Sequence, residues 1–210
     1  MIKKLLLILL SLFAIAFLGL GILVAVASTK ADEFQISRSA TIAAPAPVVF
    51  DQVNTLKKWQ AWSPWIKRDP GTKVTYAGPE SGTGASYSWV GDKETSEGKL
   101  TITDSRPSEK MECTLVFLKP FEATNTASFI LVPEDGKTKV TWIMAGKNNI
   151  VGKVMCLFMD MDKMVGGDFE EGLSSIKAIA EKEAASAPAA TTAPAPESAP
   201  APAPSPAPNS

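Results

Sequence analysis

Apolar and polar residues alternate at the start of the folded region, over residues 34–43, and this period of two predicts a half-buried strand. The apolar positions of this segment are Phe34, Ile36, Ala40 and Ile42. Pro45 and Pro47 follow, and because proline is well tolerated in the first turn of a helix, we predict a short helix over 48–54. A second short helical segment is predicted over 56–66.

The middle of the chain is predicted to be a succession of strands separated by turns rich in glycine and proline. The predicted strands cover residues 72–77, 85–90, 95–105, 110–118, 122–132 and 138–145. Short strands joined by tight turns pair most economically as neighbours in an antiparallel sheet. Gly82-Thr83-Gly84 lies between two of these strands rather than between a strand and a helix, so we interpret it as a hairpin loop and not as a dinucleotide-binding motif.

A helical pattern covers residues 150–183, where apolar residues recur at steps of three and four and form one continuous stripe. The stripe consists of Val154, Leu157, Phe158, Met161, Val165, Phe169, Leu173, Ile176 and Ala180. Gly166 and Gly167 lie in its middle, and each glycine costs a helix about 1 kcal/mol relative to alanine. We therefore expect either a kink at this point or the close approach of another group to the helix backbone.

The N-terminus carries an uncharged apolar run over residues 5–29, which two lysines precede. At roughly 1.5 Å per residue, such a helix can cross a hydrocarbon core of about 30 Å. The two lysines place residues 1–4 in the cytoplasm and the folded domain on the other side, in the periplasm or at the cell exterior. A cleaved signal peptide is the alternative, because Ala25-Val26-Ala27 fits a small-x-small cleavage site, although the run is longer than a usual signal core.

The C-terminal segment 184–210 consists almost only of Ala, Pro, Ser and Thr. Proline at this density opposes helix and sheet, and the segment has no large apolar side chain to bury. We therefore predict an extended, disordered tail.

Composition and charge exclude several classes of function. A net charge of −1 and a pI near 5.6 give no support to nucleic-acid binding. The chain has no histidine, which removes the commonest general base and the commonest transition-metal ligand. Cys113 and Cys156 cannot form a zinc site by themselves, so we expect neither a metal ion nor a cofactor. We expect both thiols to be reduced, with a disulfide between them as the alternative.

Many short motifs along residues 33–183 match one family in their order and in the type of element that carries them. These motifs are Arg38-Ser39, Ile42, Ala44-Pro45, Val49-Phe50, Trp59 to Trp65, Asp69-Pro70, Tyr76 to Pro79, Gly82 to Ala85, Tyr87 to Trp89, Pro120-Phe121, Thr138 to Trp142, Leu157 to Asp162, Asp168 to Glu170 and Gly172-Leu173. In this respect the chain resembles the polyketide cyclase/dehydrase-like branch of the START-related, helix-grip superfamily (SRPBCC). Members of that superfamily include lipid carriers, hormone receptors, cyclases and chaperone regulators, which share a cavity but not one chemistry.

The resemblance implies an α+β protein with the helix-grip (START-like) fold. A curved antiparallel sheet of about seven strands would wrap around the long C-terminal helix, with two short helices after the first strand. It also implies a cavity between the sheet and that helix. Because the helix is the only segment long enough to cover a sheet face, the pattern of elements independently favours this arrangement.

Aromatic and methionine side chains supply the candidates for the wall of such a cavity. They share strand faces or helix faces, and indoles combine a large apolar area with one N–H donor. The candidate ligand-binding residues are Trp59, Trp62, Trp65, Tyr87, Trp89, Phe117, Phe129, Trp142, Met144, Phe158, Met161 and Val165. The alternative for each of them is an ordinary place in the hydrophobic core. No catalytic residue is assigned, and the carboxylates Asp160, Asp162, Asp168, Glu170 and Glu171 are interpreted as the solvated face of the helix.

The sequence leaves three functions open. The first is a membrane-anchored, extracytoplasmic protein that binds a hydrophobic small molecule or lipid between the sheet and the C-terminal helix. The second is an enzyme of the cyclase/dehydrase type, which would rely on Tyr, Asp, Glu or Arg38 in the pocket. The third is an interaction protein of the cell envelope whose own side chains fill the cavity.

Overall fold

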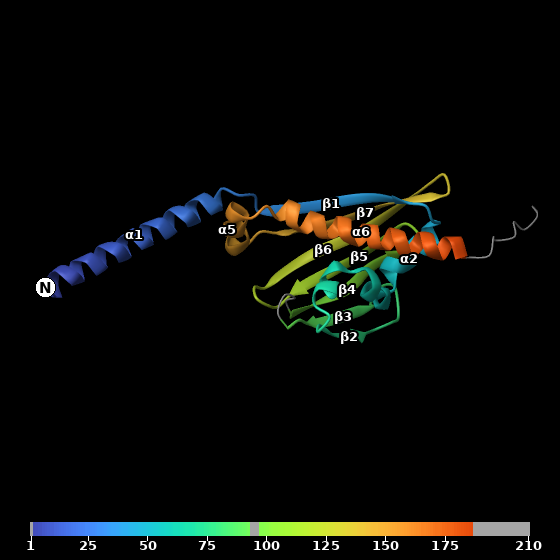
Figure 1. Cartoon of the computed structure of the whole chain (residues 1–210), viewed down its shortest axis with the longest axis horizontal. Coiled ribbons are helices and arrows are strands. Elements are labelled where there is room, and N and C mark those ends of the chain that lie inside the picture. The colour runs from blue at the N-terminus through green and yellow to red at the C-terminus, as the bar shows by residue number, and fades with distance from the viewer. Residues whose placement is uncertain (1, 93–96, 187–210) are drawn as a thin grey trace, which may run out of the picture.

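The computed structural model describes residues 2–92 and 97–186. It consists of one long N-terminal helix, α1 (Ile2–Ser28), and a body in which helices cover one face of a curved sheet (Figure 1). The apolar run predicted over 5–29 is therefore helical. Residues 184–186, which we assigned to the disordered tail, belong to the last helix, and the rest of the predicted tail lies outside the described residues.

Seven antiparallel strands form one sheet in the order β1-β7-β6-β5-β4-β3-β2. The strands are β1 (Glu33–Ile42), β2 (Lys73–Ala77), β3 (Ser86–Val90), β4 (Glu97–Arg106), β5 (Lys110–Phe117), β6 (Ala123–Glu134) and β7 (Lys137–Lys147). From β2 to β7 each strand pairs with the next, and β1 pairs with β7 at one edge. This architecture confirms the predicted α+β, helix-grip fold class.

The helices that follow β1 and the last helix pack on one face of the sheet, which we call the inner face (Figure 1). The helices that follow β1 are α2 (Ala46–Asn54), the 3-10 helix η1 (Leu56–Lys58), α3 (Trp59–Trp62) and α4 (Pro64–Arg68). The segment predicted over 56–66 is thus three short helices instead of one. Its break at Ser63 has a local cause: the residue before a proline avoids helical angles, and the ψ angle of Ser63 is 123°.

The single helix predicted over 150–183 is wrong, because the structure divides it into α5 (Ile150–Phe158) and α6 (Met161–Ser186). Met159 separates them with extended backbone angles, φ −131° and ψ 133°. The carboxylate of Asp160 accepts a hydrogen bond of 3.0 Å from the backbone N–H of Lys163, so Asp160 caps the start of α6. This turn therefore interrupts the predicted apolar stripe, and only the stripe residues that belong to α6 cover the sheet.

Gly166 confirms the predicted close approach to the helix backbone. A Cβ atom at this position would lie 2.0 Å from Nη2 of Arg38, a residue of β1. The guanidinium of Arg38 donates to Asp162 at 2.9 Å and to Glu170 at 2.7 Å, so it joins β1 to α6 across the bare glycine backbone. Gly167 has no neighbour within 4 Å of a Cβ atom built on it.

Gly166→Ala and Gly167→Ala are expected to change stability in opposite directions. At Gly166 the methyl group would displace the guanidinium of Arg38 and break its bonds to α6. At Gly167 alanine is expected to stabilise the helix by up to about 1 kcal/mol, because it is the better helix former. Circular dichroism melting of the detergent-solubilised chain measures both effects. Equal stabilisation by the two substitutions would contradict the close contact of Arg38 with α6.

Candidate functional site

Aromatic side chains fill one part of the space between the sheet and α6. Trp59, Trp62, Phe129 and Trp142 are each at most 3% exposed. The indole of Trp142 stacks against the rings of Phe129 and Phe169, with centroid distances of 4.7 Å and 4.1 Å. Trp62 meets Phe129 and Trp142 edge to face. The protein's own side chains therefore occupy this region, which we call the aromatic core.

Two hydrogen bonds orient the indoles of α3 into the aromatic core. Nε1 of Trp59 donates to the carbonyl oxygen of Val53, and Nε1 of Trp62 donates to that of Gln52, both at 2.9 Å. The two carbonyls lie in the last turn of α2, where helical partners are lacking. The structure thus places four of the twelve pocket candidates, Trp59, Trp62, Phe129 and Trp142, in packed surroundings rather than at an open wall.

A second part of the inner face is half-open. Tyr87 and Trp89 on β3 and Leu115 and Phe117 on β5 alternate there, and the strand register brings them to the same face as the buried Leu100. The ring centroids of Tyr87 and Trp89 are 5.7 Å apart, as are those of Trp89 and Phe117. All four side chains are only partly buried. We call these four residues the aromatic patch.

Gly98 on β4 makes room for the indole of Trp89. A Cβ atom at Gly98 would lie 2.5 Å from Cζ2 of Trp89 and 2.4 Å from the carbonyl oxygen of Val116. The indole therefore lies across the sheet at this strand. Gly98 and Leu115 were not among the predicted site residues, although alternation with Phe117 along β5 was a usable signal for Leu115.

Of the remaining candidates, three pack against the hydrophobic core, namely Trp65, Met144 and Val165, and the others lie beside it or away from it. Met144 is half-buried on the inner face of β7, and Trp65 is half-buried on α4. Met161 and Val165 are half-buried in the first turns of α6. Phe158 is 74% exposed on α5, so its predicted position between sheet and helix is wrong, because the chain turns away at the break before α6.

Trp142 carries an unsatisfied polar atom. Its Nε1 is the one buried side-chain nitrogen or oxygen in the described part of the chain that has no hydrogen-bond partner. A buried donor without a partner costs about 1–3 kcal/mol. A guest molecule with an acceptor oxygen, or an ordered water, would remove this cost.

Four of the five carboxylates assigned to a solvated helix face are exposed, as predicted, and Asp168 is half-buried. Four of the five also pair with distant arginines. Asp168 and Glu171 both bind Arg68 of α4, with 3.2 Å between Oε2 of Glu171 and Nη2 of Arg68. Asp162 and Glu170 form the second such group, because both accept hydrogen bonds from Arg38 of β1. These pairs fix the position of α6 relative to β1 and α4, beside the aromatic core.

The stability of the fold is expected to decrease at acid pH. The pKa of Asp162 lies below its ordinary value because Arg38 donates hydrogen bonds to its carboxylate and adds a positive charge. The unfolded chain then binds a proton at higher pH than the folded chain, so the pair stabilises the fold above about pH 4 and loses this effect as the pH falls further. The pKa values of Asp32 and Asp51 are lowered as well, and they contribute in the same direction.

Melting temperatures measured by circular dichroism from neutral pH to about pH 3 test this expectation. Asp162→Asn should lose less stability on acidification than the unmodified chain, because it lacks one of the linked protons. Identical pH slopes for the two chains would contradict the role of the Arg38–Asp162 pair.

Two buried groups at the aromatic patch are neutral at physiological pH. Burial raises the pKa of the Tyr87 phenol, and burial raises the pKa of the Cys113 thiol to about 12. Tyr87 can therefore donate a hydrogen bond but does not act as a base, and Cys113 is a protonated thiol rather than a nucleophile. Cys113 is buried and Cys156 half-buried, and the structure joins neither in a disulfide. Within the described residues, no three His, Cys, Asp or Glu side chains are placed to hold a metal ion.

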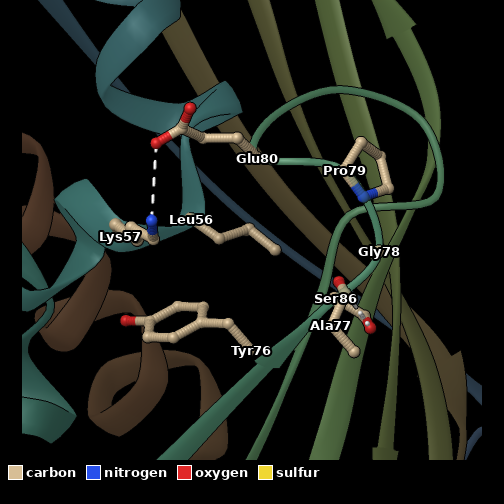
Figure 2. A pocket seen from close by; sticks show the side chains of 8 residues that line it. All are labelled: Leu56, Lys57, Tyr76, Ala77, Gly78, Pro79, Glu80 and Ser86. Carbon is tan, nitrogen blue, oxygen red and sulfur yellow. Dashed lines mark hydrogen bonds and ion pairs between the residues drawn. The ribbon is translucent and has the colours of Figure 1, made fainter.

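Two surface depressions lie outside the space beneath α6. The first has a volume of about 270 Å³ and opens between η1 and the edge strand β2, where Lys57 and Glu80 form an ion pair of 3.4 Å (Figure 2). Tyr76 forms one wall, and its ring centroid lies 6.2 Å from that of Tyr87, so this depression adjoins the aromatic patch. The second, of about 570 Å³, is lined mainly by polar outer-face residues of β1, β6 and β7.

Helix α1 is long and apolar enough to cross a membrane, by length and composition. The relevant segment, Ile8–Ser28, has 21 residues and a mean hydropathy of 2.8, and none of its most apolar stretch is buried in the structure. A signal sequence has the same properties. The C-terminal end of α1 packs against α5, and Ala27 is fully buried there.

Solved structures with the same fold differ widely in sequence from this chain. Protein CV1439 from Chromobacterium violaceum is 12% identical, with a TM-score of 0.51 over 71% of this chain and 97% of its own. The Aha1 dimer from Colwellia psychrerythraea is 14% identical, with a TM-score of 0.51 over 70% and 96%. The di-domain ARO/CYC StfQ of the steffimycin biosynthetic pathway is 10% identical, with a TM-score of 0.54 over 73% of this chain and 52% of its own, so this chain spans about half of its length.

At such identities these likenesses show the fold alone. No protein of curated function matches the chain. A family model described as polyketide cyclase / dehydrase and lipid transport matches residues 33–181, which is well over half of the sequence. With the helix-grip fold and this match together, the protein belongs to the polyketide cyclase / dehydrase and lipid transport family.

Proposed function

We propose that this protein is held in a membrane by α1 and binds an apolar small molecule or a lipid on the aromatic patch of the inner face. One observation carries the proposal: the patch stays half-open on the face that the helices cover, while the aromatic core fills the rest of that face. Covering about 200 Å² of such apolar surface contributes about 5 kcal/mol at about 25 cal/mol per Å².

One polar group of the aromatic patch can donate a hydrogen bond to an oxygen of the proposed ligand. Tyr87 keeps its phenolic proton at physiological pH. An apolar site with a few polar groups is the usual arrangement of small-molecule pockets. A fatty acid, an ester or a ketone with a long hydrocarbon portion has this chemistry.

Three observations support a retained anchor and an extracytoplasmic domain. The family description includes lipid transport, and a protein that takes up lipids would be placed usefully at a membrane. Lys3 and Lys4 precede the span and favour a cytoplasmic N-terminus, in the sense of the positive-inside rule. Ala27, the residue before the alternative cleavage position, is packed against α5 rather than free.

The filled aromatic core favours a second candidate function. In this case no ligand covers the patch, and either a displaced α6 or a protein partner does so. The domain would then be an interaction module of the cell envelope. The stacking of Trp142 on Phe169 at 4.1 Å supports this candidate, because side chains of the chain itself fill that part of the space beneath α6.

Native mass spectrometry of the full chain, released from nanodiscs without harsh detergent, separates the two candidates. We expect a species heavier than the chain by the mass of one apolar molecule, which exchanges with added palmitate. A chain that carries no adduct and takes up no palmitate would favour the second candidate. The same spectra give the mass of the chain itself, and loss of residues 1–27 would show a cleaved signal instead of an anchor.

A further inference from the structure

We propose that α5 and the loop 118–122 form a docking surface for the lipid bilayer, which holds the open end of the domain in the headgroup region of the membrane that α1 crosses. This inference rests on the proposed function, because it requires α1 to be retained as an anchor. It adds the place and the orientation in which the domain meets its ligand.

Helix α5 leaves large apolar side chains exposed next to the end of α1. Its nine residues contain one charge, Lys153, and this side chain is buried in an ion pair with Asp32. Ile150 and Val151 are exposed at its start, and Phe158 is 74% exposed at its end. In water this arrangement leaves large apolar side chains uncovered, whereas in the interface they would be buried about 5–10 Å below the headgroups.

A second exposed apolar segment lies at the same end of the sheet. Leu118 and Phe121, between β5 and β6, are exposed, the latter at 54%. Because Asn125 of β6 pairs with Gly146 of β7, the start of β6 and the end of β7 lie at the same end of the sheet, and α5 follows β7 directly. Met164 in the first turn of α6 adds a further exposed apolar side chain.

The connection to α1 keeps this end of the domain close to the membrane. Only residues 29–32 separate α1 from β1, and at most about 3.6 Å per residue limits their reach to about 14 Å. Asn148 binds this connection twice, through its backbone N–H to Asp32 at 2.8 Å and through its side chain to Ala31 at 3.1 Å. In Figure 1, α5 lies beside the end of α1, and the loop between β5 and β6 is on the same side of the sheet.

The aromatic patch lies at the same end of the sheet as the loop 118–122 of this docking surface. Phe117 is the last residue of β5 and directly precedes the loop. Trp89 is one residue from the end of β3, at the same end of the sheet. An apolar molecule dissolved in the bilayer can therefore reach the patch without crossing water. The ligand class that fits is a membrane lipid or another bilayer-soluble molecule.

Spin labels on the full chain in phosphatidylcholine vesicles test the inference. In a chain with Cys113→Ala and Cys156→Ala, one label is attached after Phe158→Cys, and a second variant, Phe121→Cys, reports independently. Val132→Cys is the matched control, because Val132 is an exposed apolar residue in β6 near the hairpin at the opposite end of the sheet. Collision rates with oxygen, which enters lipid, and with a nickel chelate, which stays in water, measure the position of each label.

We expect an oxygen-to-nickel collision ratio several-fold higher at residues 158 and 121 than at residue 132. Equal ratios at the three positions, in chains that float with the vesicles, would overturn the docking surface and leave the anchor intact. Chains that do not float would overturn the anchor and the docking surface together. Spin–spin broadening at residue 158 that disappears on dilution with unlabelled chain would assign the surface to a second copy of this protein, and would also overturn the proposal.

Discussion

Replacing Trp62 by alanine is expected to lower the free energy of unfolding by about 3–5 kcal/mol. Its side chain is fully buried and packs against the tilted ring of Trp59 at a centroid distance of 4.6 Å, so the substitution leaves a cavity in the aromatic core. It also removes the hydrogen bond to the carbonyl oxygen of Gln52, which joins α3 to α2. The aromatic core would lose a large buried side chain together with the hydrogen bond that holds α3 against α2.

Equilibrium unfolding in urea, followed by far-UV circular dichroism, measures this effect. Trp62→Phe is the matched variant, because it keeps an aromatic ring and most of the volume but loses the N–H donor. We expect it to cost less than the alanine substitution, with about 1–3 kcal/mol arising from the unpaired carbonyl of Gln52. A loss of less than about 1 kcal/mol for Trp62→Ala would mean that this region is not packed as the structure shows.

Replacing Trp89 by alanine is expected to weaken ligand binding at least tenfold while it affects stability far less than Trp62→Ala. The indole is only partly buried, so much of its area is free to contact a ligand. A tenfold change corresponds to about 1.4 kcal/mol, which is within the range of one large aromatic contact. The contrast between the two tryptophans follows from their positions, one in the aromatic core and the other in the aromatic patch.

The fraction of full-length chain that carries palmitate in native mass spectra, at increasing palmitate concentration, gives the apparent Kd. Ser88→Ala is the control, because Ser88 is the neighbouring residue on β3 and is exposed on the outer face. We expect its Kd to remain that of the unmodified chain. If Trp89→Ala bound palmitate as tightly as Ser88→Ala, the ligand would not lie on the patch.

The strands and the fold class could be predicted because their signals are local. Alternation along β1 and the turns between the later strands specify an antiparallel sheet, and family motifs add the order of its helices. The break between α5 and α6 was missed because apolar residues continue on both sides of it. Asp160 was the usable signal, since aspartate is a preferred N-cap, but an isolated aspartate on a polar helix face has the same pattern.

The aromatic residues of the inner face could also be predicted, but their division into core and patch could not. Trp62 and Trp89 have the same chemical character, and only the position of α2 and α6 over the sheet buries one and leaves the other half-open. The pairing of Arg38 with Asp162 joins residues 124 positions apart, and no local pattern encodes it. Such tertiary contacts override propensity and periodicity, which report only on neighbouring residues.

Indole N–H signals in a nitrogen–proton NMR spectrum of the full chain in nanodiscs give the most direct test of ligand binding at the aromatic patch. The chain has five tryptophans, and substitution of each by phenylalanine assigns its signal. We predict that palmitate shifts the signal of Trp89, which is only partly buried, whereas those of Trp59 and Trp62, which donate to α2, stay in place. A spectrum in which palmitate moves none of the five signals, or moves Trp62 as far as Trp89, would contradict it.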